Sequence, residues 1–256
     1  MNKRFTDSGL YKIITVLLCV IFASALVYIT FMLPPFGSPD NPAVNEVSEK
    51  YLTDGLKDTG ATNAVAGMIL DYRAFDTLGE SCVLFVATVA VFILLRSDKV
   101  LGSDEFDEVD THLELKQDFV TTRTFTVFVP IVLMFGLYVI FNGHLSPGGG
   151  FSGGAIISGA LILNLNAYGR TKTERFMNAK VYTIMSVAAL SFYCIAKSYV
   201  FYVGANGIES EIPKGIPGHI LSSGLILPLN ICVGIVVSGT IFAIYTMFRK
   251  GGFKKK

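Results

Sequence analysis

The chain has 256 residues, of which 52% are hydrophobic, with a formal net charge of +1 and a mean hydropathy of +0.55. A soluble domain buries only one face of each element, so its apolar and polar positions alternate. Here the apolar residues fall into long blocks that match the roughly 30 Å hydrocarbon core of a bilayer. This pattern excludes an ordinary soluble domain, and the balanced charge gives no reason to expect a nucleic-acid partner.

Six apolar blocks are long enough to cross a bilayer as helices, which predicts an all-α, polytopic membrane protein with about six transmembrane helices. The first block follows Lys3, Arg4 and Lys12, as a signal peptide would. Its apolar run is longer than a signal peptide needs, however, and no small-residue cleavage pattern ends it, so we expect an uncleaved anchor. The blocks are Ile13–Leu33, Leu78–Leu95, Thr124–Phe141, about Phe151–Tyr168, Val181–Val203 and His219–Phe248.

The basic residues are distributed unevenly among the connections between these blocks. Of the 21 lysines and arginines, 16 lie in the two tails and in the connections after the second and fourth blocks, whereas three lie in the other connections. Cytoplasmic segments are enriched in basic residues. We therefore expect a multi-pass protein of a prokaryotic plasma membrane, with both termini in the cytoplasm.

Connection lengths divide the chain into two helical bundles of two and four spans. Residues 1–95 hold two spans separated by a long acidic outer loop. Residues 96–123 form a charged cytoplasmic connector, and residues 124–256 hold four closely connected spans. This predicts two membrane modules joined by the connector.

The second span is preceded by a charged stretch, Asp71-Tyr-Arg-Ala-Phe-Asp-Thr-Leu-Gly-Glu80. On a continuous helix Arg73, Asp76 and Glu80 would lie along one stripe, where one ion pair leaves a carboxyl group in excess. Charges at membrane depth cost a few kcal/mol each and persist mainly where they line a polar pathway or a partner surface. All four could simply mark the membrane interface, and for Asp71 that interpretation is as good as the functional one. For Glu80, the deepest, we favour a proton-carrying role.

A glycine-rich turn, residues 142–154, separates the third and fourth spans. It lacks the Lys-Ser/Thr of a phosphate-binding loop and faces away from the cytoplasm, so nucleotide binding is excluded. Gly150, Gly154 and Ser158 have the spacing of a helix-packing face. His144 is either a proton relay or, as we slightly prefer, a residue that fixes the loop by hydrogen bonding. The structural residues of this loop are predicted to be Pro147, Gly148, Gly149, Gly150, Phe151, Gly153 and Gly154.

Polar residues also occur within the last two spans. Lys197 either extends outward to the interface or pairs with a carboxylate from another helix or subunit. Pro228 is expected to kink the sixth span, and Asn230 could satisfy the freed backbone group or line a polar pocket, but we favour a packing role for both. The four cysteines are widely separated and the three histidines lie at block edges or in a loop, so we expect no metal centre, haem or other cofactor.

Two of these segments resemble motifs of known families. Residues 142–154 resemble the Gly-His-x-x-Pro-Gly-Gly-Gly-Phe-x-Gly-Gly motif of the MnhB/MrpB subunit of multisubunit sodium/proton antiporters (Mrp complexes), which is also the F subunit of membrane-bound hydrogenases. Residues 71–80 resemble a motif near the C-terminal end of the MrpA subunit, which in membrane-bound hydrogenases is the separate E subunit. The chain therefore resembles a fusion of the two modules.

The resemblance implies a non-catalytic subunit of a cation/proton antiporter, or of a redox-driven ion pump that contains an antiporter module. Its partners would be other membrane subunits, the lipid bilayer, Na⁺ and H⁺. Glu80 would lie on the ion-translocation path, supported by Asp71, Arg73 and Asp76, to which we add Lys197 and His144 as candidates. The alternative is a purely structural adaptor that holds neighbouring subunits together. A free-standing carrier is disfavoured because no inverted repeat is evident.

Overall fold

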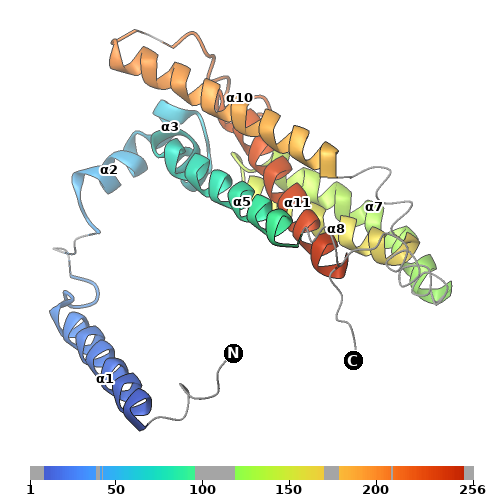
Figure 1. Ribbon diagram of the computed structural model, residues 1–256. Coiled ribbons are helices and arrows are strands. Elements are labelled where there is room, and N and C mark those ends of the chain that lie inside the picture. The colour runs from blue at the N-terminus through green and yellow to red at the C-terminus, as the bar shows by residue number, and fades with distance from the viewer. Residues whose placement is uncertain are drawn as a thin grey trace. The chain divides into compact units, whose positions relative to one another are not determined.

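A computed structural model of the protein describes residues 9–38, 41, 43–95, 119–169, 179–208 and 210–250. These residues form helices and turns, without a strand among them, and six of the helices are long and apolar enough to cross a membrane (Figure 1). The predicted all-α, polytopic class is confirmed. The chain divides into two compact units, Met1–Lys50 and Tyr51–Lys256, which are described separately below.

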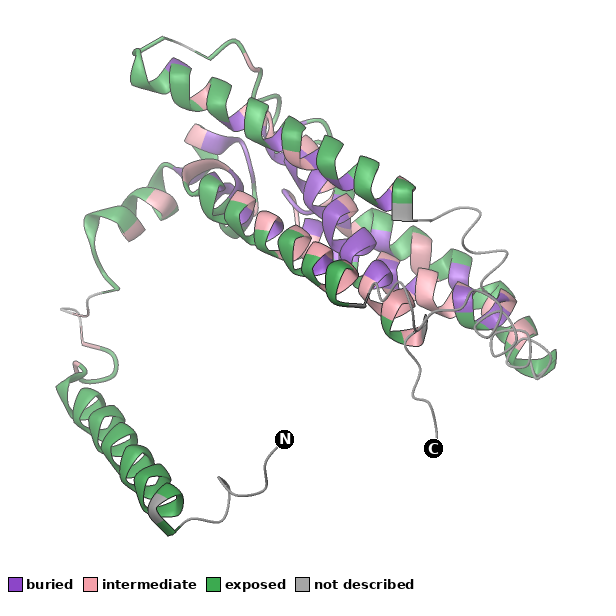
Figure 2. Ribbon diagram, in the orientation of Figure 1, coloured by how far each residue is buried: buried purple, intermediate pink, exposed green. Residues whose placement is uncertain are grey.

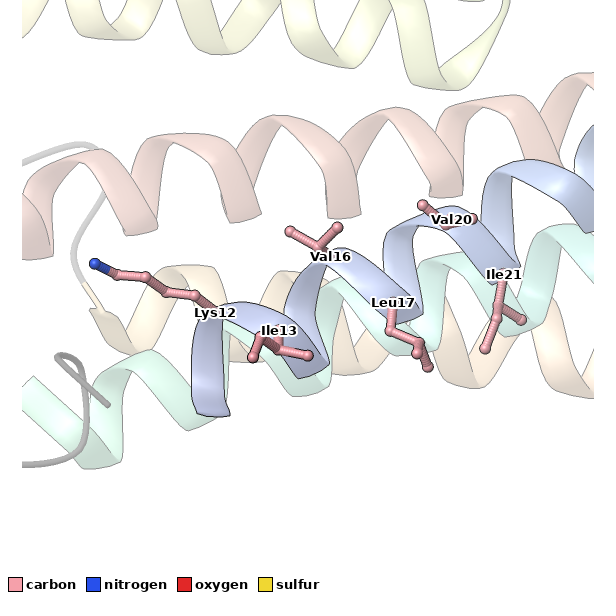
Figure 3. A pocket seen from close by; sticks show the side chains of 6 residues that line it. All are labelled: Lys12, Ile13, Val16, Leu17, Val20 and Ile21. Carbon is pink, nitrogen blue, oxygen red and sulfur yellow. The ribbon is translucent and has the colours of Figure 1, made fainter. Parts of the chain in front are cut away.

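The first unit contains α1 (Gly9–Met32). Apolar side chains surround this helix on every side, and none of the membrane-spanning window is buried within the protein (Figure 2). Figure 3 shows Lys12 at the start of a shallow apolar hollow that follows the helix. The hydroxyl groups of Thr15 and Thr30 donate to backbone carbonyls one turn back, so both hydroxyls are hydrogen-bonded within the helix. A helix of this kind is stable in lipid or against another membrane helix.

The second unit begins with short helices and continues with five long ones. The boundary between the two units falls within α2 (Glu46–Thr53). The short helices α3 (Gly55–Thr59) and α4 (Ala64–Gly67) and the π-helix η1 (Met68–Tyr72) follow it and lead into α5 (Ala74–Leu95). The remaining long helices are α7 (Phe119–Phe141), α8 (Gly150–Tyr168), α10 (Ala179–Ala205) and α11 (Ile226–Lys250).

Helix α11 lies at the centre of this unit, with more than half of its span buried. It packs against α7 and α8 on one side and against α5 and α10 on the other, and α5 also contacts α10 (Figure 1). The core contains Tyr193, Leu229 and Val236, which are almost fully buried. Two three-helix groups, α7/α8/α11 and α5/α10/α11, therefore share α11.

The predicted spans fall on the observed helices, with differences at their ends. The sixth span was predicted from His219, but α11 begins at Ile226. Ser223 has a φ of 67° and Gly224 a φ of 54°, a left-handed conformation that an α-helix cannot contain. Pro228 therefore lies in the first turn of α11, where backbone N–H groups have no partner within the helix, and the predicted mid-span kink is wrong.

The charged connector predicted for residues 96–123 falls largely on residues 96–118, outside the described residues. Its last five residues belong to α7, which begins at Phe119 rather than at Thr124. Arg123 lies over the ring of Phe119 on the same helix. Helix α7 is therefore longer than predicted by five residues, more than one turn, at its N-terminal end.

Candidate functional site

A π-helical turn leads into α5. The N–H of Arg73 donates to the carbonyl of Met68 at 2.8 Å, five residues back, and Arg73 then leaves the helical conformation at φ −116°, ψ 34°. The Thr77 hydroxyl reaches across this break and donates to the Ile69 carbonyl at 2.7 Å. A continuous helix through the charged motif was expected, but the structure does not have one. The wide π-helical turn separates Asp71 from the residues of α5.

Asp71 and Lys197 form an ion pair, with 3.0 Å between Nζ and Oδ1. The Lys197 side chain is 3% exposed and that of Asp71 is 35% exposed. Lys197 precedes the end of α10 by about 12 Å of helix. The sequence left two interpretations open for Lys197, outward extension to the interface or pairing with a carboxylate. The structure shows the second, with the carboxylate on η1. The partly exposed Asp71 thus provides an anion for the buried Lys197, whose charge alone would be costly at this place.

Tyr193, one turn before Lys197, anchors α10 to the start of α5. Its hydroxyl donates to the Ala74 carbonyl at 2.9 Å, and its side chain is almost fully buried. This tyrosine was not among the residues predicted from the sequence. Its spacing of four from Lys197, which puts both side chains on one face of α10, is the signal that could have found it.

Arg73 and Asp76 form a second ion pair, on the surface of the chain. The Nε of Arg73 donates to Oδ2 of Asp76 at 2.7 Å, and the two side chains are 59% and 54% exposed. Because water or a partner can compete for both groups, this pair adds little to the stability of the isolated fold.

Glu80 lies on the exposed side of α5, below that pair. Within the described part of the chain it forms no ion pair. Gly79 and Val83 are exposed beside it, and nothing lies within 4 Å of a Cβ placed on Gly79. The carboxyl group therefore lies on an open helix face, about 9 Å along α5 from Ala74, where the candidate membrane span of the structure begins.

The segment that precedes the π-turn, from α2 to α3, also contacts it. The Tyr72 hydroxyl donates to Oδ2 of Asp58 at 2.6 Å, and its ring lies 4.9 Å from that of Tyr51. Burial, and then the hydrogen bond to Asp58, raise the pKa of Tyr72 far above its ordinary value. Tyr72 therefore stays a protonated donor that fixes the start of the motif. No pattern in the sequence indicates this contact.

The glycine-rich turn packs backbone against backbone. Gly148 and Gly149 have φ values of 143° and 125°, and the Gly150 N–H donates to Oδ1 of Asn230 at 2.9 Å. A Cβ on Gly150 would lie 2.5 Å from the Asn230 carbonyl oxygen, and one on Gly153 would lie 2.5 Å from a side-chain carbon of α7. Gly154 meets α11 in the same way, whereas Pro147 is exposed and Phe151 is partly buried against the core.

His144 is fully buried in this turn. Its Nε2 lies 3.3 Å from the His219 carbonyl oxygen, and its Nδ1 has no partner in the described part of the protein. Its own carbonyl accepts the N–H of Asn63, whose side-chain Nδ2 donates to the carbonyls of Gly143 and Ser146, both at 2.9 Å. No described hydrogen bond or ion pair joins His144 to the charged groups at α5. Asn63, which was not among the predicted residues, ties α4 to the glycine-rich turn.

The candidate residues thus form three groups: the Asp71–Lys197 pair with Tyr193, the exposed face of α5 with Arg73, Asp76 and Glu80, and the glycine-rich turn with His144. Three or more His, Cys, Asp or Glu side chains that could hold one metal ion are not found together among the described residues.

These features define a multi-pass, all-α membrane protein that carries ionisable groups inside its helix bundle. Residues 120–243 match the family described as a domain related to the MnhB subunit of the Na⁺/H⁺ antiporter. Residues 12–101 match the MbhE family, which is described as the E subunit of MBH. The chain belongs to the family in which these two modules are joined, as the resemblance implied.

Relatives and solved structures agree with this assignment. An uncharacterised protein of Methanocaldococcus jannaschii is 30% identical over 213 residues, which are 77% of this chain and 78% of that protein. A chain of the membrane-bound sulfane sulfur reductase, an archaeal respiratory membrane complex, has a TM-score of 0.69 at 26% identity, covering 93% of this chain and 98% of that one. A chain of the Mrp complex from Dietzia sp. has a TM-score of 0.66 at 21% identity, covering 98% of this chain and 27% of that one, and shows the same fold.

Proposed function

We propose that the chain contributes part of the cation and proton translocation path of a multisubunit assembly, either an antiporter or a redox-driven pump that contains an antiporter module. Glu80 is the proton-carrying carboxyl group. The Asp71–Lys197 pair holds a second set of charges beside it, and Arg73 and Asp76 shape the approach from the outer surface. The assembly lies in a prokaryotic plasma membrane, with both termini of this chain in the cytoplasm.

The observation that carries this proposal is the exposure of Glu80 on a membrane-spanning helix. A charged carboxylate facing lipid costs roughly 2.5–3.5 kcal/mol at the centre of a transmembrane helix on insertion scales, and less towards the ends of the helix, where Glu80 lies. Glu80 forms no ion pair among the described residues that would offset that cost. Small or apolar neighbours on the same face, such as Gly79 and Val83, leave room for another helix of the assembly. The carboxyl group is therefore suited to an interface between subunits, where a proton can be passed on.

The experiment is Glu80→Gln in the intact assembly, with proton and sodium movement followed in everted membrane vesicles. Glutamine keeps the shape and hydrogen-bonding capacity but cannot ionise, so transport is expected to fall by about tenfold or more while the complex still assembles. The matched control is Glu46→Gln in the first turn of α2, an exposed residue outside the span, which should transport normally. Normal transport by the assembled Glu80→Gln variant would contradict the proposal.

The alternative is a structural adaptor without a role in ion movement. The helix-packing face of the glycine-rich turn is covered by α7 and α11 of the same chain, so it is not open to a neighbouring subunit. An adaptor would instead use the exposed face of α5 or the exposed helix α1. It predicts that Val83→Trp, which enlarges that face of α5, separates the subunits, whereas Glu80→Gln leaves both assembly and transport intact.

A further inference from the structure

The junction of α5, α10 and α11 contains a stripe of hydroxyl groups inside the membrane span, and Oγ of Ser186 lies 3.9 Å from a Cβ placed on Gly239 of α11. On α5 these are Thr77, Ser81 and Thr88, and on α10 they are Tyr193, Ser186 and Tyr182, all at most 3% exposed. Spacings of four and seven residues place each set on one face of its helix. We call these six residues the polar seam. Each set extends over about 16 Å, roughly half of the hydrocarbon core.

The two helices run antiparallel along the seam. Tyr193 bonds to Ala74 at the start of α5, whereas the ring of Tyr182 lies 6.3 Å from that of Phe85 and 5.8 Å from that of Phe92, further along. Ser186 lies between these two tyrosines on α10. Along the helix axes, Ser186 therefore lies beside the part of α5 between Ser81 and Phe85, within about one helical turn of Ser81.

At this level, Oγ of Ser81 and Oγ of Ser186 have no hydrogen-bond partner among the residues that the structure describes. Other hydroxyls in the long helices, such as those of Thr30, Thr88 and Thr126, donate to the carbonyl four residues back. Leaving a buried hydroxyl unpaired costs about 1–3 kcal/mol in proteins. Buried water is the usual partner of such groups, and it makes two to four hydrogen bonds.

The ends of the seam are already hydrogen-bonded. At one end, Tyr193 holds the start of α5, one turn from Lys197 and its partner Asp71. At the other end, the Tyr182 hydroxyl lies 3.2 Å from Oγ1 of Thr240 on α11. Hydroxyls one helical turn apart, about 5.4 Å, are bridged by a single water at ordinary hydrogen-bond lengths. Ser81 lies one turn from Thr77 and Ser186 one turn from Tyr182, whereas Ser186 and Tyr193 are two turns apart, so a file of more than one water would be needed to join the two ends.

We propose that Ser81 and Ser186 anchor a file of water molecules in the polar seam, and that this file carries protons through the chain between the Asp71–Lys197 pair and Tyr182. Each hydroxyl or water oxygen accepts one proton and passes on another, so no group of the seam changes its covalent state. The inference rests on the proposed translocation role, but it places a route inside this chain rather than at the Glu80 surface.

The test uses the Ser81→Ala/Ser186→Ala double variant in the intact assembly. Alanine removes both anchors with little change in volume. Proton flux in everted vesicles is expected to fall by about tenfold at unchanged assembly. The matched control is Ser158→Ala on α8, which removes an equally buried and unpaired hydroxyl outside the seam and should transport normally. Normal flux in the assembled double variant would overturn the proposal.

Radiolytic hydroxyl-radical labelling provides a readout that a packing role would not change. Bound water next to Tyr182 and Tyr193 should lead to their modification in the wild-type assembly in spite of their burial, with a clear decrease in the double variant. Unlabelled tyrosines in the wild type would overturn the proposal even if the double variant failed to assemble. Loss of transport in Glu80→Gln with normal flux in the serine variant would reject the seam alone. The opposite result would reject Glu80 alone.

Discussion

The two sides of α11 differ in what fills the space between the helices. On the α7/α8 side, Gly150, Gly153 and Gly154 bring backbones so close that an added Cβ would clash with the neighbouring helix. On the α5/α10 side, larger polar side chains meet, among them Lys197 and Tyr193. Close backbone packing leaves no room for water, whereas side chains with hydroxyl or charged ends can bind water and protons. One helix thus joins a rigid group to a polar one.

The largest effect is expected for Gly150→Ala on the rigid side. The new Cβ would lie 2.5 Å from the Asn230 carbonyl oxygen and 2.6 Å from Cβ of Val233, both on α11. We expect the free energy of unfolding to fall by about 3 kcal/mol, measured as a lower thermal midpoint and a lower yield of assembled complex.

Gly159→Ala on the same helix is the control, since nothing lies within 4 Å of a Cβ there. Replacing a mid-helix glycine should stabilise α8 by roughly 0.5–1 kcal/mol. If the two alanine variants behaved alike, α8 and α11 would not be in backbone contact in the assembly, and the contrast between the two sides would fail.

An intermediate effect is expected for the ion pair on the polar side. Lys197→Met leaves the Asp71 carboxylate without its cation, and Asp71→Asn leaves the Lys197 ammonium buried without its anion. Because Asp71 is partly exposed, we expect each single variant to lose about 2 kcal/mol, with a coupling of about 1–2 kcal/mol in the double variant. Denaturant or thermal unfolding of the purified assembly measures the three values.

Lys180→Met provides the control for this cycle, since it removes an exposed lysine at the other end of α10. It should change the unfolding free energy by less than about 0.5 kcal/mol. Additive losses in the double variant would mean that Asp71 and Lys197 do not interact, and the polar side of α11 would lose its charged end.

The smallest effect is expected for Asp76→Asn, which breaks the exposed pair with Arg73. Stability of the isolated chain in detergent should change by about 0.5 kcal/mol or less, because both side chains are more than half exposed. The same measurement on the whole assembly sharpens the comparison. A loss several times larger there would show that a partner subunit buries this pair, in agreement with the proposed interface around Glu80.

Much of the fold could be predicted from the sequence, and less of the candidate site. The six spans are local, because about twenty successive apolar residues suffice for a transmembrane helix whatever surrounds them. The start of α11 was predicted seven residues too early, because apolar residues lie on both sides of Ser223. The left-handed backbone of Ser223, which prevents the helix from starting earlier, depends on contacts with Lys214 and Gly60. The charged residues before α5 were identified from the sequence. For Lys197, however, the sequence left open whether it extends to the membrane interface or pairs with a carboxylate, and it did not identify Asp71 as the partner.

The amino-acid sequence alone determined the number of membrane spans, the charged motif before the second long span and the glycine-rich turn, because hydropathy and local motifs depend on neighbours along the chain. Only the tertiary structure decided that α5 packs on α10 and α11, that Asp71 meets a lysine 126 residues away, and that Ser81 and Ser186, within about one turn of the same level, find no hydrogen-bond partner in the described part of the chain. These outcomes depend on which helices are neighbours and on their relative rotation. Both are set by packing across the bundle rather than by the order of residues in any one segment.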